Sequence, residues 1–514
     1  MTNGTIAPAS VSATGTGSPT VSAVISGAGA LTVNKTGGML TLTGANTYTG
    51  GTTITAGTLQ LGNGTTDGTL TGDIVNNGTL LENIVGTPTY SGNISGTGAL
   101  NKTGTGTLTL GGTNTYTGAT TVNAGTLALS GTYTGGGALT VNAGATFTGS
   151  SSGTNTLGNF LVTGASSAAT LTSGTYNVAS TSGGGVANTR INNGGSLTVN
   201  GATLNITGAG AWFPIGDTAA TTSTVTLNSG VINVSNDFGA EVGRIGTGVL
   251  NINGGTFTVN DTNSIGLVIG DQVTAQSGTV NLNGGVLAVR LLLSKNGTNA
   301  LNFNGGTLQA TSTNSGATFW ASSSTLTANV RNNGGTIDNN GTSIKIGQAL
   351  VHSTIGGDND TDGGMKFTGA GTTTLTGANT FTGATQVNGG TLLLASTGSL
   401  DGSISLGVAS GATLELDNNV SLNDTITLSL VSGATLNLNF ALGTDETIGV
   451  LVLNGTTAPA GTYDAAALAG LGGASGITFT GSGALTVAAV PEPSVFGLLG
   501  LGLASVLFLR RRRC

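Results

Sequence analysis

A twenty-residue block that occurs three times is the feature that most constrains the fold of this chain. It reads LTGANTYTGGTTITAGTLQL over residues 42–61, LGGTNTYTGATTVNAGTLAL over 110–129 and LTGANTFTGATQVNGGTLLL over 375–394. Together with their lead-ins, these strong repeats cover residues 27–62, 96–129 and 366–394. Repetition of a unit this long indicates that one small structural unit stacks on the next, as in solenoids, propellers and other arrays.

A looser repeat fills residues 190–340, where Asn-Gly-Gly or Asn-Ser-Gly precedes a short apolar alternation. Its asparagines are Asn193, Asn228, Asn253, Asn283, Asn304 and Asn333. A longer echo also exists, because Ile215-Gly216-Asp217 recurs as Ile269-Gly270-Asp271. We expect asparagines at equivalent turns to stack into hydrogen-bonded ladders between neighbouring units.

Short strand-like runs such as TLQL, TVTL and TFTV separate the turns throughout the chain. They alternate Thr with Val, Leu or Phe, which is the period-two pattern of half-buried strands. Glycine and asparagine, which tolerate the left-handed conformation of tight turns, stand between the runs. Before residue 490 only residues 464–473 suggest a turn or two of helix, and the aromatic signature of propeller blades is missing.

We therefore predict an all-β fold, an elongated right-handed parallel β-helix (β-solenoid) that spans residues 21–489. Its core is expected to be thin, because the 514 residues include 93 glycines and only 4% are aromatic. Residues 1–20 are expected to be an irregular segment. They show neither the charged start nor the apolar stretch of a signal peptide, so we expect the true export signal to be missing here.

The charge balance excludes one class of partner. Only 6% of the residues are charged and the net charge is −7. Four of the 13 basic residues stand together near the end of the chain, as Arg510, Arg511, Arg512 and Arg513. A protein that binds nucleic acid needs a basic face to neutralise phosphates, so we expect no nucleic-acid partner.

The tail, residues 490–514, differs from everything before it and reads VPEPSVFGLLGLGLASVLFLRRRRC. Pro491 and Pro493 disfavour helix and strand, which leaves an extended peptide that a processing enzyme can reach. The apolar run 495–509 predicts a short transmembrane or sorting helix of roughly 22 Å, below the roughly 30 Å of a hydrocarbon core. By the positive-inside rule the arginines stay in the cytoplasm, which places the rod outside the membrane.

Two resemblances follow from these residues. The block that contains Asn46-Thr47-Tyr48-Thr49-Gly50 resembles the autotransporter-associated (passenger-associated) β-strand repeat, which implies an exported, elongated β-helical domain. The tail resembles the PEP-CTERM sorting signal through Pro491, Glu492 and Pro493 and the arginines that follow the apolar run. This second resemblance implies recognition and processing by an exosortase, in bacteria that make exopolysaccharide.

One segment offers candidate metal ligands. Asp358, Asp360 and Asp362, followed by Gly363, match the first half of a calcium loop. The loop pattern then requires a glutamate where Gly369 stands. We therefore weigh a weak calcium site against a solvated loop, and we expect no other cofactor.

Catalytic residues are sparse. Asp237, Glu241 and Arg244 form the richest charged stretch, and we expect Glu241 and Arg244 to be an exposed ion pair. A polysaccharide lyase or hydrolase built on a β-helix would need clustered carboxylates, here from the loops around residues 237–271. The single histidine, His352, has no evident partner in the sequence.

Two aromatic pairs contain the tryptophans, Trp212-Phe213 and Phe319-Trp320. Exposed rings would stack on sugars, whereas buried rings would fill the core, and we favour packing. We predict that the protein is not an enzyme but an exported structural protein of the bacterial surface or matrix, associated with exopolysaccharide, biofilm or adhesion. The alternatives are a carbohydrate-active enzyme and an adhesin with a specific glycan or protein partner.

Overall fold

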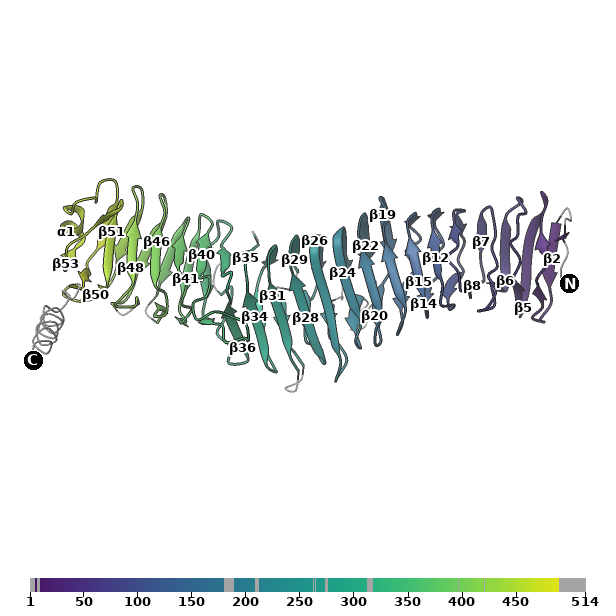
Figure 1. Cartoon of the computed structure of the whole chain (residues 1–514), viewed down its shortest axis with the longest axis horizontal. Coiled ribbons are helices and arrows are strands. Elements are labelled where there is room, and N and C mark those ends of the chain that lie inside the picture. The colour runs from purple at the N-terminus through teal and green to yellow at the C-terminus, as the bar shows by residue number, and fades with distance from the viewer. Residues whose placement is uncertain are drawn as a thin grey trace, which may run out of the picture.

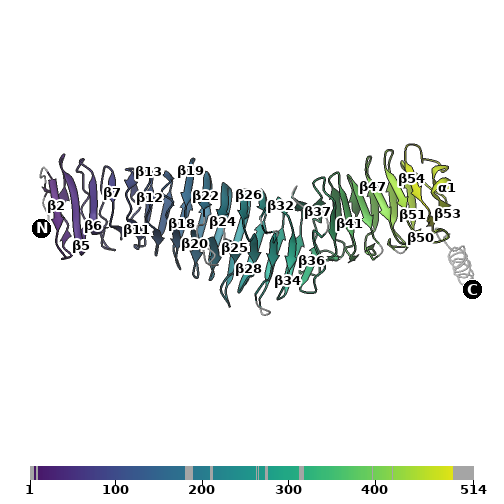
Figure 2. The ribbon, with the colours of Figure 1, turned by 180° about the vertical axis from the view of Figure 1, so that it is seen from behind.

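The computed structural model describes residues 5–6, 10–179, 189–208, 212–261, 263, 265–272, 276–311, 318–395, 397–419 and 421–489. In these residues it contains 55 strands and one short helix. The strands stack into a long rod, with the N-terminal strands at one end and the C-terminal strands at the other (Figure 1). The same rod seen from behind shows that it bends near β36 (Figure 2).

The alternation of threonine and leucine builds the rungs. In the sequence TLTL of β12 (Thr107–Leu110), both leucines are buried and both threonines face outward. β12 pairs in parallel with β15 (Thr126–Leu129), so Leu108 lies beside Leu127 and Leu110 beside Leu129. Repeated over the rod, this register stacks apolar side chains in inward rows and leaves hydroxyl groups outside.

One sheet runs along the first two thirds of the rod and holds 16 strands. They are β2 (Ser10–Thr14), β3 (Thr20–Val21), β5 (Ala30–Leu42), β6 (Thr52–Leu61), β7 (Ile74–Asn76), β8 (Thr79–Glu82), β10 (Ile94–Ser95), β11 (Ala99–Lys102), β14 (Thr120–Val122), β17 (Leu139–Val141), β20 (Phe160–Thr163), β23 (Thr189–Asn192), β25 (Phe213–Ile215), β27 (Ala240–Val242), β30 (Leu267–Ile269) and β33 (Leu292–Ser294). Single bridges from Trp320 to Leu292 and to Ile346 continue this face into a six-stranded sheet. Its strands are β38 (Ile344–Ile346), β41 (Thr372–Leu375), β44 (Thr391–Leu394), β47 (Thr413–Leu416), β49 (Thr435–Leu438) and β54 (Thr478–Gly481).

A second long sheet holds 24 strands, of which all but the last pair in parallel. Besides β12 and β15, they are β9 (Thr89–Tyr90), β18 (Thr146–Gly149), β19 (Thr154–Leu157), β21 (Ala168–Leu171), β22 (Thr175–Ala179), β24 (Ser196–Gly208), β26 (Thr222–Asn236), β28 (Thr247–Ile252), β29 (Thr256–Val259), β31 (Gly278–Leu282), β32 (Val286–Val289), β34 (Asn299–Phe303), β35 (Thr307–Ala310), β36 (Leu326–Val330), β37 (Gly335–Asp338), β39 (Leu350–His352), β40 (Met365–Thr368), β43 (Thr385–Val387), β46 (Ser405–Val408), β48 (Thr427–Leu430), β51 (Val450–Leu453) and β52 (Thr456–Thr457).

Smaller sheets complete the structure. They are formed by β1 (Thr5–Ile6) with β4 (Val24–Ile25), β13 (Thr113–Asn114) with β16 (Thr132–Tyr133), β42 (Ala378–Asn379) with β45 (Ser399–Leu400), and β50 (Asp445–Ile448) with β55 (Ala484–Val487) and β53 (Gly461–Asp464). The β53 and β55 strands are antiparallel, unlike the stacked rungs. Helix α1 (Ala465–Ala469) follows, and the Asp464 side chain caps it by accepting a hydrogen bond from Ala467 N at 2.8 Å.

The nearly all-strand structure with long parallel sheets fits the predicted β-solenoid, and the short helix within residues 464–473 is confirmed. Strands start earlier than expected, because β2 lies within residues 1–20 and pairs with β5. Its Val11 and Ala13 pack against the core, which explains why this segment is regular. Among the described residues no helix has the length and apolar character to cross a membrane. The predicted helix 495–509 lies outside the described residues.

Candidate functional site

The repeated block forms a corner of the rod that is closed by a buried asparagine. Asn46, Asn114 and Asn379 are at most 1% exposed. The Asn379 amide donates to Gly377 O at 2.9 Å and to Ser399 O at 2.8 Å. Asn46 and Asn114 make the same pair of bonds, one to the glycine two residues earlier and one to the next rung. The asparagine therefore ties its own turn to the next rung.

A glycine of the block brings two backbones close together. Gly125 has a φ of +63°, and a Cβ atom there would lie 2.4 Å from Gly106 O. Gly57 and Gly390, its equivalents, also have positive φ and the same close approach. Only glycine fits a left-handed turn that presses on the preceding rung.

The aromatic residue of the block fills the corner. The Tyr116 hydroxyl lies 2.7 Å from Thr120 Oγ1, and the Tyr48 hydroxyl makes the equivalent contact with Thr52. In the third copy the aromatic residue is Phe381, and Thr385 Oγ1 lies 3.0 Å from Ser403 Oγ instead. The change from tyrosine to phenylalanine thus comes with a new partner for the buried threonine.

A buried lysine also belongs to the second copy. Lys102 lies in register with Glu82 on the neighbouring strand, and both side chains are almost fully buried. The Lys102 ammonium donates to Gly104 O and to Ala124 O. Burial raises the pKa of Glu82 to about 8, although the nearby Lys102 opposes this shift. Lys102 therefore donates hydrogen bonds to two backbone carbonyl groups of this corner from inside the rod.

Five residues of alternating charge lie on successive rungs of the first long sheet, Arg190 within β23 and the other four just after their strands. Arg244 Nη1 lies 2.6 Å from Asp217 Oδ1, and Arg190 Nη1 lies 3.4 Å from Asp217 Oδ2. Further along, Lys295 Nζ lies 2.5 Å from Asp271 Oδ1. Because parallel rungs place equivalent residues about 4.8 Å apart, charges of one sign would repel, whereas alternating signs attract. We call these residues the charge ladder.

The sequence contains a signal for the charge ladder that the sequence analysis missed. Asp217 and Asp271 end the recognised Ile-Gly-Asp echo, and Arg244 ends Val-Gly-Arg midway between them. Arg244 follows Asp217 by 27 residues, which is the length of one rung here. Counting units at that interval would have placed the three charges in one column.

Glu241 lies inside the charge ladder and is 4% exposed. Its Oε2 atom lies 3.0 Å from Arg244 Nε, so the predicted ion pair is confirmed, but the prediction that it is exposed is wrong. Trp212 packs on the same arginine, with its ring centroid 4.2 Å from the Arg244 guanidinium carbon. Burial, aided by the carboxylate of Asp271, raises the pKa of Glu241 to about 8.

This pairing bears on the enzyme alternative. The carboxylate of Asp271 lies near enough to Glu241 to contribute to the rise of its pKa. Glycoside hydrolysis uses carboxyl groups separated by about 5 Å or more, which leaves room for the sugar or water between them. Asp237, the other carboxylate of this stretch, is half-buried.

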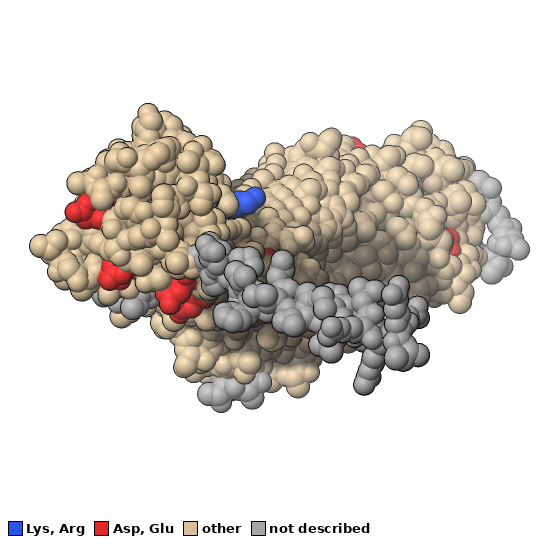
Figure 3. Space-filling model, turned by 60° about the vertical axis from the view of Figure 1, so that its left-hand side comes forward, with Lys and Arg blue, Asp and Glu red and all other residues tan. Residues whose placement is uncertain are grey.

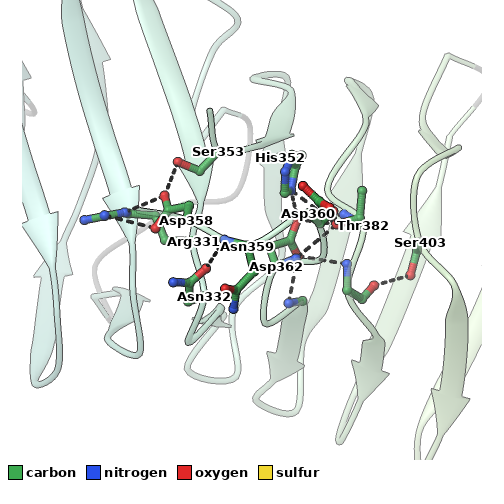
Figure 4. A network of polar contacts seen from close by, with 12 residues as sticks. Arg331, Asn332, His352, Ser353, Asp358, Asn359, Asp360, Asp362, Thr382 and Ser403 are labelled. Carbon is green, nitrogen blue, oxygen red and sulfur yellow. Dashed lines mark hydrogen bonds and ion pairs between the residues drawn. The ribbon is translucent and has the colours of Figure 1, made fainter. Parts of the chain in front are cut away.

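The candidate calcium loop follows β39, and its aspartates point to different partners (Figure 4). Arg331 binds Asp358 through two hydrogen bonds of 2.8 and 3.0 Å, which hold the pKa of Asp358 below its ordinary value. Asp362 instead accepts hydrogen bonds from Gly364 N and Gly383 N, while Asp360 is exposed. Within the described part of the chain, no three His, Cys, Asp or Glu side chains are placed to hold a metal ion.

His352 belongs to the same network and has partners there that the sequence alone does not reveal. Its Nδ1 atom lies 3.0 Å from Asp362 Oδ2 and 3.2 Å from Thr382 Oγ1 (Figure 4). Thr382 belongs to the third repeat block, and its N–H also donates to Asp362 at 2.7 Å. The network thus fastens that block to the preceding rung. The sequence does not indicate this contact, because His352, Asp362 and Thr382 are brought together only by the turns of the rod.

The paired aromatic residues pack as predicted, with one exception. Phe213, Phe319 and Trp320 are fully buried. The rings of Trp320 and Phe303 lie 6.4 Å apart inside the rod. Trp212 is half-buried beside the charge ladder. Three of the four rings therefore belong to the core.

Asparagine ladders line the outside of the central rungs, residues 196–333. One ladder runs along equivalent turns of successive rungs. The hydrogen bonds from each side-chain amide nitrogen to the side-chain oxygen of the preceding rung are 2.7, 2.7, 2.9, 3.4 and 3.0 Å long. Its members in order are Asn200, Asn228, Asn253, Asn283, Asn304 and Asn333. The predicted ladder is confirmed except at its start, because Asn200 and not Asn193 is the partner of Asn228. Asn193 adopts a left-handed turn with a φ of 52°.

The surface carries few charges. In the space-filling view, acidic and basic side chains are scattered over a face that is otherwise uncharged (Figure 3). The predicted sorting residues Pro491, Glu492 and Pro493, and the four terminal arginines, lie outside the described residues.

Comparison with known families identifies two kinds of segment. The model of the passenger-associated-transport-repeat matches residues 33–61, 100–129 and 368–394. The model of the PEP-CTERM protein-sorting motif matches residues 489–513. Both resemblances inferred from the sequence are thereby confirmed. No curated protein and no solved structure matches the chain significantly.

Proposed function

We propose that this chain, which carries three passenger-associated-transport-repeats and a PEP-CTERM sorting motif, is a non-catalytic structural protein of the bacterial surface or extracellular matrix. The sorting motif marks an exported protein of the cell envelope, and it is the observation that carries the proposal. An exosortase-type enzyme would process the tail. In the matrix, the rod would associate with exopolysaccharide and contribute to biofilm or adhesion.

The succession of proline motif, apolar run and arginines in the tail suggests how sorting would work. Before processing, the apolar residues 495–509 would hold the chain in the membrane as a helix. The four arginines would stay on the cytoplasmic side, so that the rod, a right-handed β-helix, lies outside. Processing near Pro491, Glu492 and Pro493 would then release the rod to the surface.

The uniform outer surface supports a structural role. Rungs of similar build succeed one another along the rod, and the faces between corners present threonine and asparagine. Such a surface offers many equivalent weak contacts, which add up along a polymer. The charge ladder contributes ion pairs between successive rungs.

Cell fractionation tests the sorting step. Double substitution Pro491→Ala/Pro493→Ala is expected to retain a longer product in the membrane fraction, whereas Pro459→Ala, an exposed proline of the rod, should leave processing unchanged. Products of identical size and location for the wild type and the tail variant would refute the sorting role.

Activity measurements test the non-catalytic assignment. The purified chain is expected to release no product from acidic or neutral polysaccharides. Turnover that disappears in both Asp237→Ala and Glu241→Ala would instead establish the carbohydrate-active enzyme.

A further inference from the structure

A shallow groove lies on the outer face of the second long sheet, over β22, β24, β26 and β29. It is lined by Asn177, Asn205, Thr207, Asn233, Val234, Ser235, Thr258 and Asn260. None of these side chains is charged, and all but valine are polar. The groove runs along the rod, because Asn177, Asn205, Asn233 and Thr258 occupy equivalent positions on four successive rungs.

An amide ladder fixes the orientation of the side chains in this groove. Asn205 Nδ2 donates to Asn177 Oδ1 at 2.8 Å, and Asn233 Nδ2 donates to Asn205 Oδ1 at 2.9 Å. Asn205 thereby uses one of its two N–H groups and one acceptor position of its oxygen. The second N–H and the second lone pair remain for another molecule. A donor and an acceptor are thus presented together and held in place before any ligand binds.

The spacing of these groups favours a linear polymer. Rungs repeat every 4.8 Å or so, a distance comparable to the length of one sugar unit. A sugar hydroxyl both donates and accepts hydrogen bonds, which matches the free donor and acceptor of each amide. An anionic chain would find no opposite charge among the lining residues, and a folded protein would not repeat at the rung interval.

We infer that this groove binds an uncharged polysaccharide chain that lies parallel to the axis of the rod. The inference rests on the proposed function, which places the rod where polysaccharide is present. Asn205 and Asn233 would contact successive sugar units, and Ser235 would add a hydroxyl from the adjacent row. Aromatic side chains do not line the groove, so hydrogen bonds supply the recognition and each rung contributes weakly.

Binding of the full-length chain to defined polysaccharides tests the inference. The neutral probes are dextran, laminarin, mannan and xyloglucan, and the acidic probes are alginate and polygalacturonate, each measured by affinity electrophoresis and calorimetry. At least one neutral probe should bind, and Asn205→Ala/Asn233→Ala should weaken that binding tenfold or more. The matched control, Asn228→Ala/Asn253→Ala, removes amides of the turn ladder from the same part of the rod and should change binding less than twofold.

Circular dichroism and sedimentation velocity accompany each variant, so that binding is compared between folded samples whose oligomeric state is known. The inference is wrong if no neutral probe binds, if the groove variant binds like the wild type, or if the control loses affinity equally. Tighter binding of the acidic probes would also overturn it. If the groove variant instead abolishes a dimer of the wild type without affecting glycan binding, the face contacts a second copy. These results are independent of the fractionation test, so the groove can fail while the sorting role stands.

Discussion

Asparagine has opposite roles in two regions of this rod. In the three repeat blocks, residues 42–61, 110–129 and 375–394, the shared asparagine is buried and binds backbone carbonyls of its own turn and of the next rung. In the central rungs, residues 196–333, asparagines line the outside and bind one another. The residue type is the same, but its surroundings and partners differ.

The difference explains why one repeat is strict and the other loose. A buried amide leaves unsatisfied backbone groups when it is lost, so few other side chains are tolerated at that position. An exposed ladder loses only weak contacts that water replaces. The blocks therefore fix the register of the rungs, whereas the central rungs leave their outer side chains available for binding.

The largest effect is expected from the glycine of the block. Gly125→Ala forces a left-handed backbone onto alanine and pushes its Cβ atom against Gly106 O, which should cost about 3 kcal/mol. Gly136→Ala is the matched control, because Gly136 also has a positive φ of 75° but no atom within 4 Å of its added Cβ. It should cost about 1 kcal/mol. Equal denaturant midpoints for the two variants would show that close packing in the block is unimportant.

The next effect compares the two kinds of asparagine directly. Asn379→Ala removes the hydrogen bonds to Gly377 O and Ser399 O and should cost about 2 kcal/mol. Asn253→Ala, in the exposed ladder, should cost less than about 0.5 kcal/mol. Amide hydrogen exchange should increase near residue 399 only in the first variant. Similar losses in both would remove the distinction between the regions.

Glu241, the buried carboxyl of the central rungs, is expected to contribute to the pH dependence of stability, together with Glu82 near the second repeat block. Since burial raises the pKa of Glu241 from 4.5 to about 8, the folded rod keeps a proton that the unfolded chain releases between these values. Its stability should therefore fall as the pH rises from 5 to 8. Glu241→Gln keeps an uncharged group there and should make the decline shallower, as measured by thermal unfolding at each pH. A decline of the same slope in the variant would assign it to other groups.

The smallest effect is expected at the aromatic residue of the block. Tyr116→Phe removes the hydroxyl that pairs with Thr120 and should cost about 1 kcal/mol. Phe381→Tyr should change stability less, because Thr385 already pairs with Ser403. Adding Ser403→Ala to Phe381→Tyr should then be better tolerated than Ser403→Ala alone. If the stability changes of Phe381→Tyr and Ser403→Ala simply add, the two side chains do not share Thr385 as a partner.

Much of the fold could be predicted because its determinants are local. Alternating runs such as TLTL specify strands, and the repeated Asn and Gly specify corners that recur with the block. The exposed asparagine ladder could also be predicted from its turns, except that Asn200 replaces Asn193. These features depend on residues that are close in sequence or on units that are visibly repeated.

The remaining features depend on contacts between rungs of unequal length. His352 and Asp362 meet because the loop after β39 folds back, and nothing in their spacing indicates this. The burial of Glu241 depends on neighbours from other rungs such as Asp271, which the charged stretch in the sequence does not indicate. Asp358 likewise pairs with Arg331 of an earlier rung, which the spacing of the aspartates does not indicate.

The central claim is that successive rungs stack in parallel register, and distances between spin labels test it most directly. Thr109, Thr226 and Asn281 lie in one outward row, in which five pairings separate the first two and seven separate the first and third. With Cys514 replaced by serine and cysteines introduced in pairs, the backbone separations should be about 24 Å for Thr109 and Thr226 and about 34 Å for Thr109 and Asn281. Narrow distributions that lengthen in this proportion are the predicted result. Equal distances for the two pairs, or broad distributions in both, would contradict the stacked rod.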